Sequence, residues 1–223
     1  MQPVLTAGAV HLWRFSLNAA PSFAQVLSSE EQTRAQRLKA PEKARSFAVA
    51  RTRLRQILGG YLNLPPEVLR FAYGANGKPA LAAELDTGIQ FNLSHSGDWG
   101  LCALTLGGAI GVDLEQVSPT LEFLPLAQRF FSCAEINWLN SWPQGRRRRA
   151  FYRLWTRKEA WLKGHGDGFS SPTLALDSRH LATTITTAHD WTLLNLLARR
   201  GYVAALALQG CPNQLLRLNW PED

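Results

Sequence analysis

The order of strand-like and helix-like segments is the feature that most restricts the fold of this chain. An apolar strand-like segment at 10–15 precedes a long basic helical region that reaches about residue 62, and two short strands follow at 89–106. A further strand at 109–117 leads into more helical sequence. Because the strands and helices do not alternate regularly, we expect an α+β fold rather than a doubly wound parallel sheet.

Local signals predict the bounds of several elements. The basic region at 34–58 has apolar faces that suit one helix, or two helices broken near Pro41. Ser132 is a suitable N-cap for a helix that begins near Ala134, and another helix is expected at 150–163. Turn residues separate three weak strands in the tail, which we expect at 173–177, 191–198 and 202–209.

Composition indicates an ordinary globular protein. A chain of 223 residues with 46% hydrophobic content can bury a core as one large domain or as two small halves. No apolar run is long enough to cross a bilayer, and the first residues lack the order of a signal peptide, so we expect a cytoplasmic protein. Cys102, Cys133 and Cys211 stand far apart, which supports neither a disulfide framework nor a zinc site.

The charge balance is basic and indicates the kind of partner. The chain has 24 Lys and Arg against 17 Asp and Glu, a formal net charge of +7. This balance favours an acidic partner or a phosphorylated ligand. The basic residues concentrate at 34–58 and in the run Arg146–Arg149, and such a run is usually a solvated helix start or loop.

The helix expected at 150–163 carries charges beside a wide apolar face. Lys158 falls in the middle of that face and Glu159 at its edge, whereas Arg153 and Arg157 point to water. Glu159 and Lys163 are spaced so that their side chains can meet. The apolar arc consists of Phe151, Leu154, Trp155, Trp161 and Leu162.

Two interpretations of this helix remain open. In the first, the ammonium of Lys158 reaches past the core to water, and Glu159 and Lys163 form a surface ion pair. In the second, these side chains belong to a site for an anion and a metal ion. The glycines that follow favour the second interpretation, because they end a helix and let a backbone approach a ligand, and they stand at Gly164, Gly166 and Gly168.

The strand at 109–117 contains two carboxylates that share one face. Side chains alternate along a strand, so Asp113 and Glu115 project together while Val112 and Leu114 pack on the other side. A solvent-facing strand edge explains most such pairs. A third carboxylate from another element would instead make a site for a hard cation such as Mg²⁺, and Glu159 is the candidate.

Loop residues supply candidate partners for a phosphate. Ser94, His95 and Ser96 stand at the end of a short strand, where hydroxyl and imidazole groups can meet a ligand. Lys78 follows the turn residues Asn76 and Gly77. Alone, each of these residues is more simply an exposed loop residue. They become candidate phosphate ligands only if they face one site.

Taken together, these segments resemble a known enzyme family. The segments "NGKPAL", "FNLSHSGDW", "GVDLEQV", "RFFSCAEINWL" and "FYRLWTRKEAWLKGHGDG" occur in this order over roughly residues 30 to 170. In this order and spacing they are similar to the motifs of the broad-specificity, surfactin-type 4'-phosphopantetheinyl transferases. All four shared elements of that family are present: the GKP turn, the NxSHS strand end, the GVDLE strand and the WTxKEAxxK helix with GxG after it.

This resemblance implies a fold and a reaction. The fold would be a pseudo-twofold pair of similar α/β halves, residues 1–107 and 108–223, with coenzyme A and Mg²⁺ or Mn²⁺ in the cleft between them. The reaction would move the phosphopantetheine arm of coenzyme A onto a serine of an apo acyl, peptidyl or aryl carrier protein, releasing adenosine 3',5'-bisphosphate. Such carriers serve fatty acid, polyketide and nonribosomal peptide synthesis. We expect a monomer that binds neither nucleic acid nor membrane.

The resemblance also implies roles for individual residues. The metal ligands would be Asp113, Glu115 and Glu159, and the catalytic residues Glu159 and Lys163. The residues that contact coenzyme A would be Arg34, Arg51, Lys78, Ser94, His95, Lys158 and Lys163. Where the family often has a second basic residue shortly before Arg34, this chain has Glu30 and Glu31.

Elementary chemistry agrees with these roles. Attack of a serine hydroxyl on a pyrophosphate requires neutralised phosphate charge, a stabilised leaving group and a proton acceptor. Mg²⁺ would neutralise the phosphate charge by bridging the two phosphates. Lys158 and Lys163 would stabilise the developing charge, and Glu159 would act as the base. Two other functions fit part of this pattern, a nucleic-acid-binding protein without catalysis and a metal-dependent phosphohydrolase. The first gives no reason for the three carboxylates, whereas the second shares them.

Overall fold

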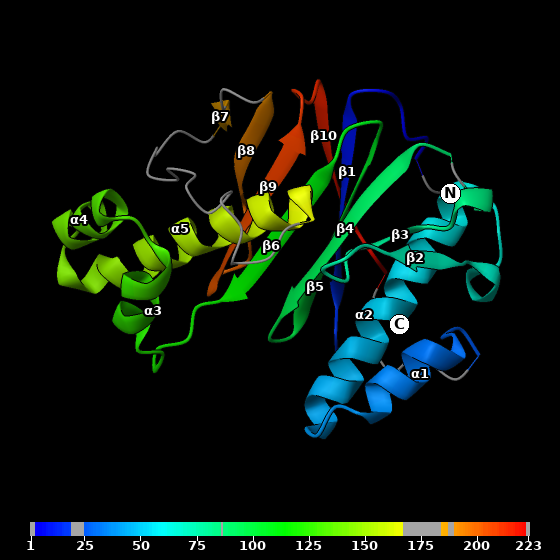
Figure 1. Cartoon of the computed structure of the whole chain (residues 1–223), viewed down its shortest axis with the longest axis horizontal. Coiled ribbons are helices and arrows are strands. Elements are labelled where there is room, and N and C mark those ends of the chain that lie inside the picture. The colour runs from blue at the N-terminus through cyan, green and yellow to red at the C-terminus, as the bar shows by residue number, and fades with distance from the viewer. Residues whose placement is uncertain (1–2, 19–24, 86, 167–183, 187–189, 222–223) are drawn as a thin grey trace.

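The computed structural model describes residues 3–18, 25–85, 87–166, 184–186 and 190–221. Within these residues, two four-stranded sheets lie side by side and a long helix covers each of them (Figure 1). Helices and strands are thus mixed without regular alternation. The α+β fold class predicted from the sequence is confirmed.

The first sheet contains strands from both ends of the described chain. Its strand order is β10 (Gln214–Asn219), β1 (Ala9–Ser16), β5 (Trp99–Leu106) and β4 (Ile89–Ser96). β10 pairs with β1 in parallel, and the other neighbours are antiparallel. The helix α2 (Pro41–Leu62) packs on this sheet, with the shorter α1 (Ser29–Gln36) beside it (Figure 1).

A small hairpin follows α2 and extends toward the second sheet. It consists of β2 (Phe71–Tyr73) and β3 (Pro79–Leu81), with the short 3-10 helices η1 (Pro66–Val68) before it and η2 (Ala83–Leu85) after it. The apolar residues of α2, the hairpin and the first sheet form one core. The hairpin therefore belongs to the N-terminal part of the molecule.

The second sheet is antiparallel throughout. Its order is β6 (Ile110–Gln116), β9 (Tyr202–Gln209), β8 (Trp191–Leu196) and β7 (Thr184–Thr186). The helix α5 (Gln144–His165) crosses this sheet, and α3 (Phe123–Phe130) and α4 (Cys133–Ser141) pack near its first turns (Figure 1). The site helix of the sequence analysis is thus a central element of this half.

The contact between β6 and α5 requires a glycine. A side chain on Gly111 would collide with the carbonyl oxygen of Ala160 and the amide of Gly164. Because Gly111 has no such side chain, the main chains of strand and helix can touch. This close approach fixes the carboxylates of β6 relative to the charged residues of α5.

Most of the predicted element bounds are confirmed. The chain breaks between α1 and α2 just before Pro41, and Ser132 caps α4 through a reciprocal pair of bonds with Glu135. Strands occur near 191–198 and 202–209, whereas the strand predicted at 173–177 lies outside the described residues. β10 was not anticipated.

The helix α5 differs from its prediction in two ways. It begins at Gln144 rather than near residue 150, because the arginine run forms its first turns, where Arg147 and Arg148 donate to main-chain carbonyls of neighbouring loops. The prediction that Arg157 points to water is wrong. Its side chain is buried and its Nε donates to Asn195 Oδ1 of β8 at 2.9 Å, since the helix is covered on most of its sides. In the part of the chain that the structure describes, no helix is long and apolar enough to cross a membrane.

Candidate active site

The two sheets are joined by polar side chains of β4. Each of these side chains accepts a main-chain N–H bond from β6, in the manner of a strand-to-strand ladder. The bonds run from Val112 N to Asn92 Oδ1 (2.9 Å), from Leu114 N to Ser94 Oγ (3.2 Å) and from Gln116 N to Ser96 Oγ (3.1 Å). The junction thus places the polar edge of β4 against the carboxylate strand β6.

Both serines also hold a carboxylate. Ser94 Oγ donates to Asp113 Oδ1 at 3.0 Å, and Ser96 Oγ donates to Glu115 Oε2 at 2.9 Å. Lys163 Nζ, from the last turns of α5, donates to Asp113 Oδ1 at 2.6 Å and to Ser94 Oγ at 3.0 Å. Asp113 Oδ2 is buried and has no hydrogen-bond partner. The junction therefore carries an excess of acceptors over donors.

Glu159 completes a group of three carboxylates. Burial raises the pKa of Glu159 to about 7, and the negative charges of Asp113 and Glu115 add to this rise while Lys163 opposes it. Burial and the neighbouring Asp113 likewise raise the pKa of Glu115. Although burial acts to lower the pKa of Lys163, the attraction of Asp113 and of both glutamates raises it. The charge of Asp113 thus acts on both glutamates, and that of Glu115 also acts on Glu159.

These side chains fit a hard divalent cation by their chemistry. Carboxylate oxygens are the ligands that Mg²⁺ prefers, and a cation would relieve the repulsion that raises the two glutamate pKa values. Asp113 Oδ2 offers a buried oxygen without a partner. Among the described residues, no group of three His, Cys, Asp or Glu side chains is arranged as a ready metal cluster, and the ammonium of Lys163 lies against Asp113.

A cavity of about 670 Å³ opens beside this group. Ser96, which holds Glu115, lines it together with His95. Two basic residues at the start of α2, Lys43 and Arg45, face the same space. Burial lowers the pKa of His95, and the positive charge of Lys163 lowers it further. The cavity thus combines basic and hydroxyl groups at the edge of the carboxylate group.

The structure brings most of the predicted site residues together. Asp113, Glu115, Glu159, Lys163 and Ser94 form the carboxylate group, and His95 lines the adjoining cavity. The guanidinium of Arg34 lies over the ring of Phe47, another lining residue, at 5.4 Å from its centre.

Lys78 instead reaches from the hairpin turn to the main chain of α5 and β6. Its Nζ donates to the carbonyl oxygens of Gly164 at 2.7 Å and of Ile110 at 3.1 Å, and Asn76 in the same turn donates to Gly166. Burial lowers the pKa of Lys78 to about 8. The hairpin turn therefore caps the end of α5, where helix carbonyls lack partners.

Arg51 and Lys158 are held by buried glutamates. Arg51 pairs with Glu31 at 2.7 Å and donates to Tyr73, whereas Lys158 pairs with Glu135 at 3.0 Å. The structure brings neither basic side chain into the carboxylate group. These pairs indicate a structural role, because each charge is matched where it is buried.

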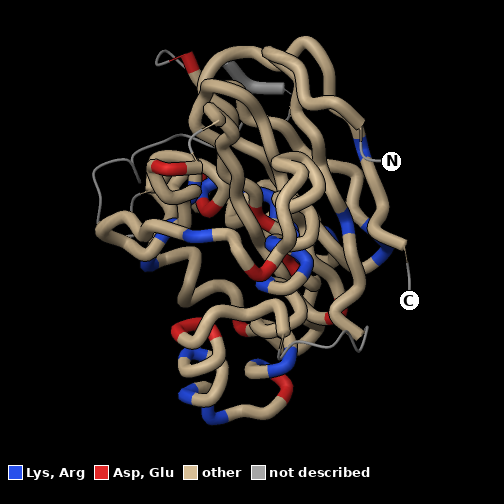
Figure 2. Tube along the Cα trace, turned by 90° about the vertical axis from the view of Figure 1, so that its right-hand side faces the viewer, with Lys and Arg blue, Asp and Glu red and all other residues tan. Residues whose placement is uncertain are grey.

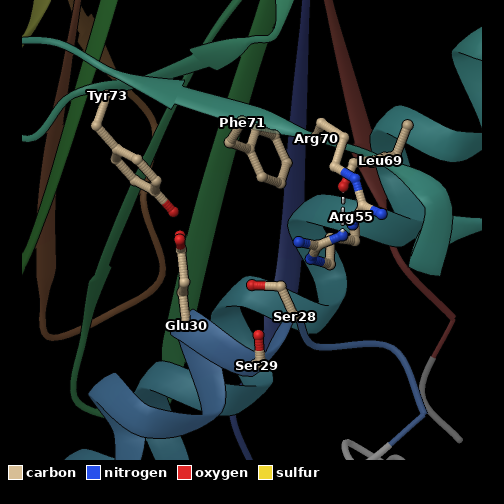
Figure 3. A pocket seen from close by; sticks show the side chains of 8 residues that line it. All are labelled: Ser28, Ser29, Glu30, Arg55, Leu69, Arg70, Phe71 and Tyr73. Atoms are coloured by element: carbon tan, nitrogen blue, oxygen red, sulfur yellow. Dashed lines mark hydrogen bonds between the residues drawn. The ribbon is translucent and has the colours of Figure 1, made fainter.

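A second cavity lies on the other side of α1. Its volume is about 300 Å³, and Figure 3 shows the carboxylate of Glu30 and the hydroxyl of Tyr73 directed toward each other across it. The buried Arg55 on its wall already donates to Glu31 and to the carbonyls of Pro66 and Leu69. Arg70 is a second basic residue on its wall, but none of the three carboxylates Asp113, Glu115 and Glu159 adjoins this cavity through a lining residue. Its lining consists of Ser28, Ser29, Glu30, Arg55, Leu69, Arg70, Phe71 and Tyr73.

Sequence reasoning missed several residues of the candidate site. Lys43 and Arg45 gave no signal, because they stand in a helix with many other basic residues. Asn92 was also missed, although it left a signal: it alternates along β4 with Ser94 and Ser96, the two serines already indicated by the sequence, and this period of two places all three on one face.

Comparison with known proteins shows the family of this chain. Residues 109–207 match the 4'-phosphopantetheinyl transferase superfamily model, and residues 11–106 match the model of a 4'-phosphopantetheinyl transferase N-terminal region. The chain is 41% identical over 217 residues to 4'-phosphopantetheinyl transferase HetI of Nostoc sp., which covers 92% of this chain and 90% of that protein. It is 31% identical over 150 residues to 4'-phosphopantetheinyl transferase Sfp of Bacillus subtilis. This match covers 67% of this chain and 65% of that protein. The chain therefore belongs to the 4'-phosphopantetheinyl transferase family.

Proposed function

We propose that this protein transfers the 4'-phosphopantetheine arm of coenzyme A to a serine hydroxyl of an apo acyl, peptidyl or aryl carrier protein, releasing adenosine 3',5'-bisphosphate. The observation that carries the proposal is the group of three carboxylates and Lys163 beside a cavity whose lining includes His95, Lys43 and Arg45. The matching families and the names of the relatives support the same reaction.

Asp113, Glu115 and Glu159 would hold Mg²⁺ or Mn²⁺. When bound, the cation supplies positive charge that neutralises the pyrophosphate of coenzyme A. The excess of carboxylates over cations supports this assignment, since Lys163 alone does not balance the three acids. Lys163 is partly exposed and can donate to a phosphate oxygen as charge develops there.

Glu159 would accept the proton of the attacking hydroxyl. Its pKa of about 7 suits a general base, because a base is most effective when its pKa lies near the working pH. The nucleophile belongs to the carrier protein, so the reaction requires no activated serine or cysteine in this chain.

Coenzyme A would lie in the cavity of about 670 Å³. Its phosphates would meet His95, Lys43 and Arg45 on the walls, with Arg34 at the rim. In this arrangement Lys43 and Arg45 replace Arg51 and Lys158, whose charges are matched by glutamates. The lining residues of this cavity all lie within 17–98, in the N-terminal half, so the expected cleft between the two halves stays a prediction.

Repeated features support a pseudo-twofold relation of the halves. A serine and glutamate cap the first helix of each pair, Ser28 with Glu31 in α1 and Ser132 with Glu135 in α4. Each glutamate then pairs with a basic residue, Arg55 or Lys158, that occupies the same position in a following 22-residue helix. We place the division at Gly107–Gly108, with β10 crossing back to the first sheet.

The other candidate functions are less well supported. Figure 2 shows Lys and Arg spread over many elements with acidic residues between them, which does not favour a nucleic-acid surface. A phosphohydrolase would share the carboxylates but would need no carrier protein. The expected monomer, the cytoplasmic location and the absence of nucleic-acid and membrane partners stay predictions.

A mass measurement tests the proposed reaction. A purified apo carrier protein is incubated with coenzyme A, Mg²⁺ and this protein, and we expect a mass gain of one phosphopantetheine on the carrier. Chelation of the metal with EDTA should prevent the gain. Release of adenosine 3',5'-bisphosphate from coenzyme A without a mass gain on any carrier would favour the phosphohydrolase instead.

A further inference from the structure

We propose that Ser94 and Ser96 are positioning residues, each of which fixes one carboxylate of β6 against the main chain of the same strand. The inference rests on the proposed function, in which these carboxylates hold the divalent cation. It assigns the two serines a role in arranging the metal ligands rather than in binding the phosphates of coenzyme A.

The same arrangement occurs twice along the junction. Ser94 donates to the carboxylate of Asp113 and accepts the N–H of the next residue, Leu114. Ser96 donates to the carboxylate of Glu115 and accepts the N–H of Gln116. Each hydroxyl thus spans a side chain and the adjacent peptide of β6, which restricts the rotamer of the carboxylate.

The hydrogen-bonding capacity of Ser94 is fully used. A serine hydroxyl has one proton to donate and two lone pairs to accept with. The proton of Ser94 goes to Asp113, and the lone pairs accept from Leu114 N and Lys163 Nζ. No donor remains for a phosphate oxygen, so this serine can act on the reaction only through Asp113 and Lys163.

Asn92 provides an internal comparison. It accepts the N–H of Val112, so it joins β4 to β6 as the serines do. The residue before Val112 is Gly111, which has no side chain to hold. Asn92 therefore contributes to the junction without touching a carboxylate.

The test measures metal binding directly. Mn²⁺ is titrated into the full-length protein and followed by electron paramagnetic resonance, with the melting temperature recorded for each variant. We expect Ser96→Ala to weaken Mn²⁺ binding about 10-fold or more, the usual cost of removing an outer partner of a metal ligand. Ser96 is only partly buried and its partner N–H is exposed, so the melting temperature should change little.

Two further variants separate positioning from packing. Ser96→Thr retains a hydroxyl and should restore Mn²⁺ affinity. Asn92→Ala should lower the melting temperature because it leaves a buried N–H unpaired, with unchanged Mn²⁺ affinity.

The possible contrary results differ in what they overturn. Equal Mn²⁺ affinity in the wild type and Ser96→Ala would overturn this inference alone. Weak binding by Ser96→Thr as well as Ser96→Ala would do the same, because the hydroxyl would then not matter. If the wild type itself bound no Mn²⁺, both this inference and the three-carboxylate metal site would be wrong, whereas transfer to the carrier would still be tested separately by mass.

Discussion

Two clusters of charged side chains, one buried and one partly buried, differ in how their charges are balanced. In the arginine cluster, Glu31 accepts bonds from Arg51 and Arg55, both at 2.7 Å. In the carboxylate group, Asp113, Glu115 and Glu159 share the cation Lys163. The first cluster has more positive than negative side chains, and the second has the opposite balance.

The pKa values reflect this difference. Burial alone would raise the pKa of Glu31. The charges of Arg51 and Arg55 and the hydrogen bond from the Ser28 main chain lower this pKa below its ordinary value. In the other group, burial and mutual repulsion raise the pKa of Glu115 and bring that of Glu159 to about 7. The charges of the first cluster are matched as it stands, whereas the second carries an excess of negative charge, as the proposed cation site requires.

The largest expected effect is on turnover, in Asp113→Asn. This change keeps the shape of the side chain but removes its charge, so we expect transfer to fall about 10³-fold, as for loss of a group that stabilises developing charge. The melting temperature should stay within a few degrees of wild type. The mass gain on the carrier and a thermal melt measure the two quantities. Near wild-type turnover in the folded variant would contradict the contrast between the clusters.

The arginine cluster should respond in the opposite way to Glu31→Gln. Two buried guanidinium groups would lose their counter-charge, and we expect a loss of about 3 kcal/mol in the free energy of unfolding. Turnover per folded molecule should be retained. Urea unfolding provides the measurement, and Glu30→Gln on the same helix is the matched control, since that side chain is exposed. A stable variant with weakened coenzyme A binding would instead place Glu31 and Arg51 in the cofactor site.

Glu159→Gln should show a pH-dependent gain in stability. The folded-state pKa of Glu159 is about 7, above its ordinary value of 4.5, so folding favours its protonated form. The wild type therefore loses stability as the pH rises from 4.5 through 7, and the variant does not. Because Glu159 is partly exposed, we expect only about 2–4 °C in melting temperature at pH 8, near 1 kcal/mol.

Melts of the wild type and Glu159→Gln at several pH values check this prediction. The two curves should converge near pH 4.5, and Mg²⁺ should remove the difference at pH 8 by stabilising the wild type. Turnover of the variant should fall by orders of magnitude. Parallel losses of turnover and stability would mean that the helix only carries a structural ion pair.

The smallest expected effect concerns Lys78→Met, at the contact between the two parts. Its ammonium donates to Ile110 and Gly164 carbonyls, and loss of these bonds should cost about 1 kcal/mol. Coenzyme A affinity, measured by calorimetry, should be unchanged if this capping is the role of Lys78. Lys39→Met, on the exposed surface, is the control. A drop in affinity at constant stability would support the cofactor contact predicted from the sequence.

The sequence predicted those parts of the fold that depend on local signals. The period-two alternation around Asp113 and Glu115 marked β6, and Ser132 as an N-cap marked the start of α4. The group formed by Asp113, Glu115, Glu159 and Lys163 was also anticipated, because the family motif joins residues that lie far apart in the chain.

Partners from other elements could not be predicted. The helical pattern of Arg51 and Lys158 does not reveal that Glu31 and Glu135, each at the start of a preceding helix, neutralise them. Likewise, Arg157 faces outward on an isolated helix, and its burial depends on Asn195 of a strand much later in the sequence. The periodicity of apolar residues identifies the face of a helix that packs on the core. Whether a charge on another face is buried depends on the elements that pack against that face.

The parallel pairing of β10 with β1 has a consequence for the synthesis of the chain. Ala9 to Arg14 pair with residues 214–219. The first sheet therefore lacks one strand until residues 214–219 have left the ribosome. Until then, the hydrogen-bonding edge of the apolar strand β1 is open on that side and can pair with another chain. We therefore expect chaperones to bind the chain at β1 during translation. A short peptide with the sequence of β10, added in trans, should reduce the aggregation of a chain truncated before Gln214.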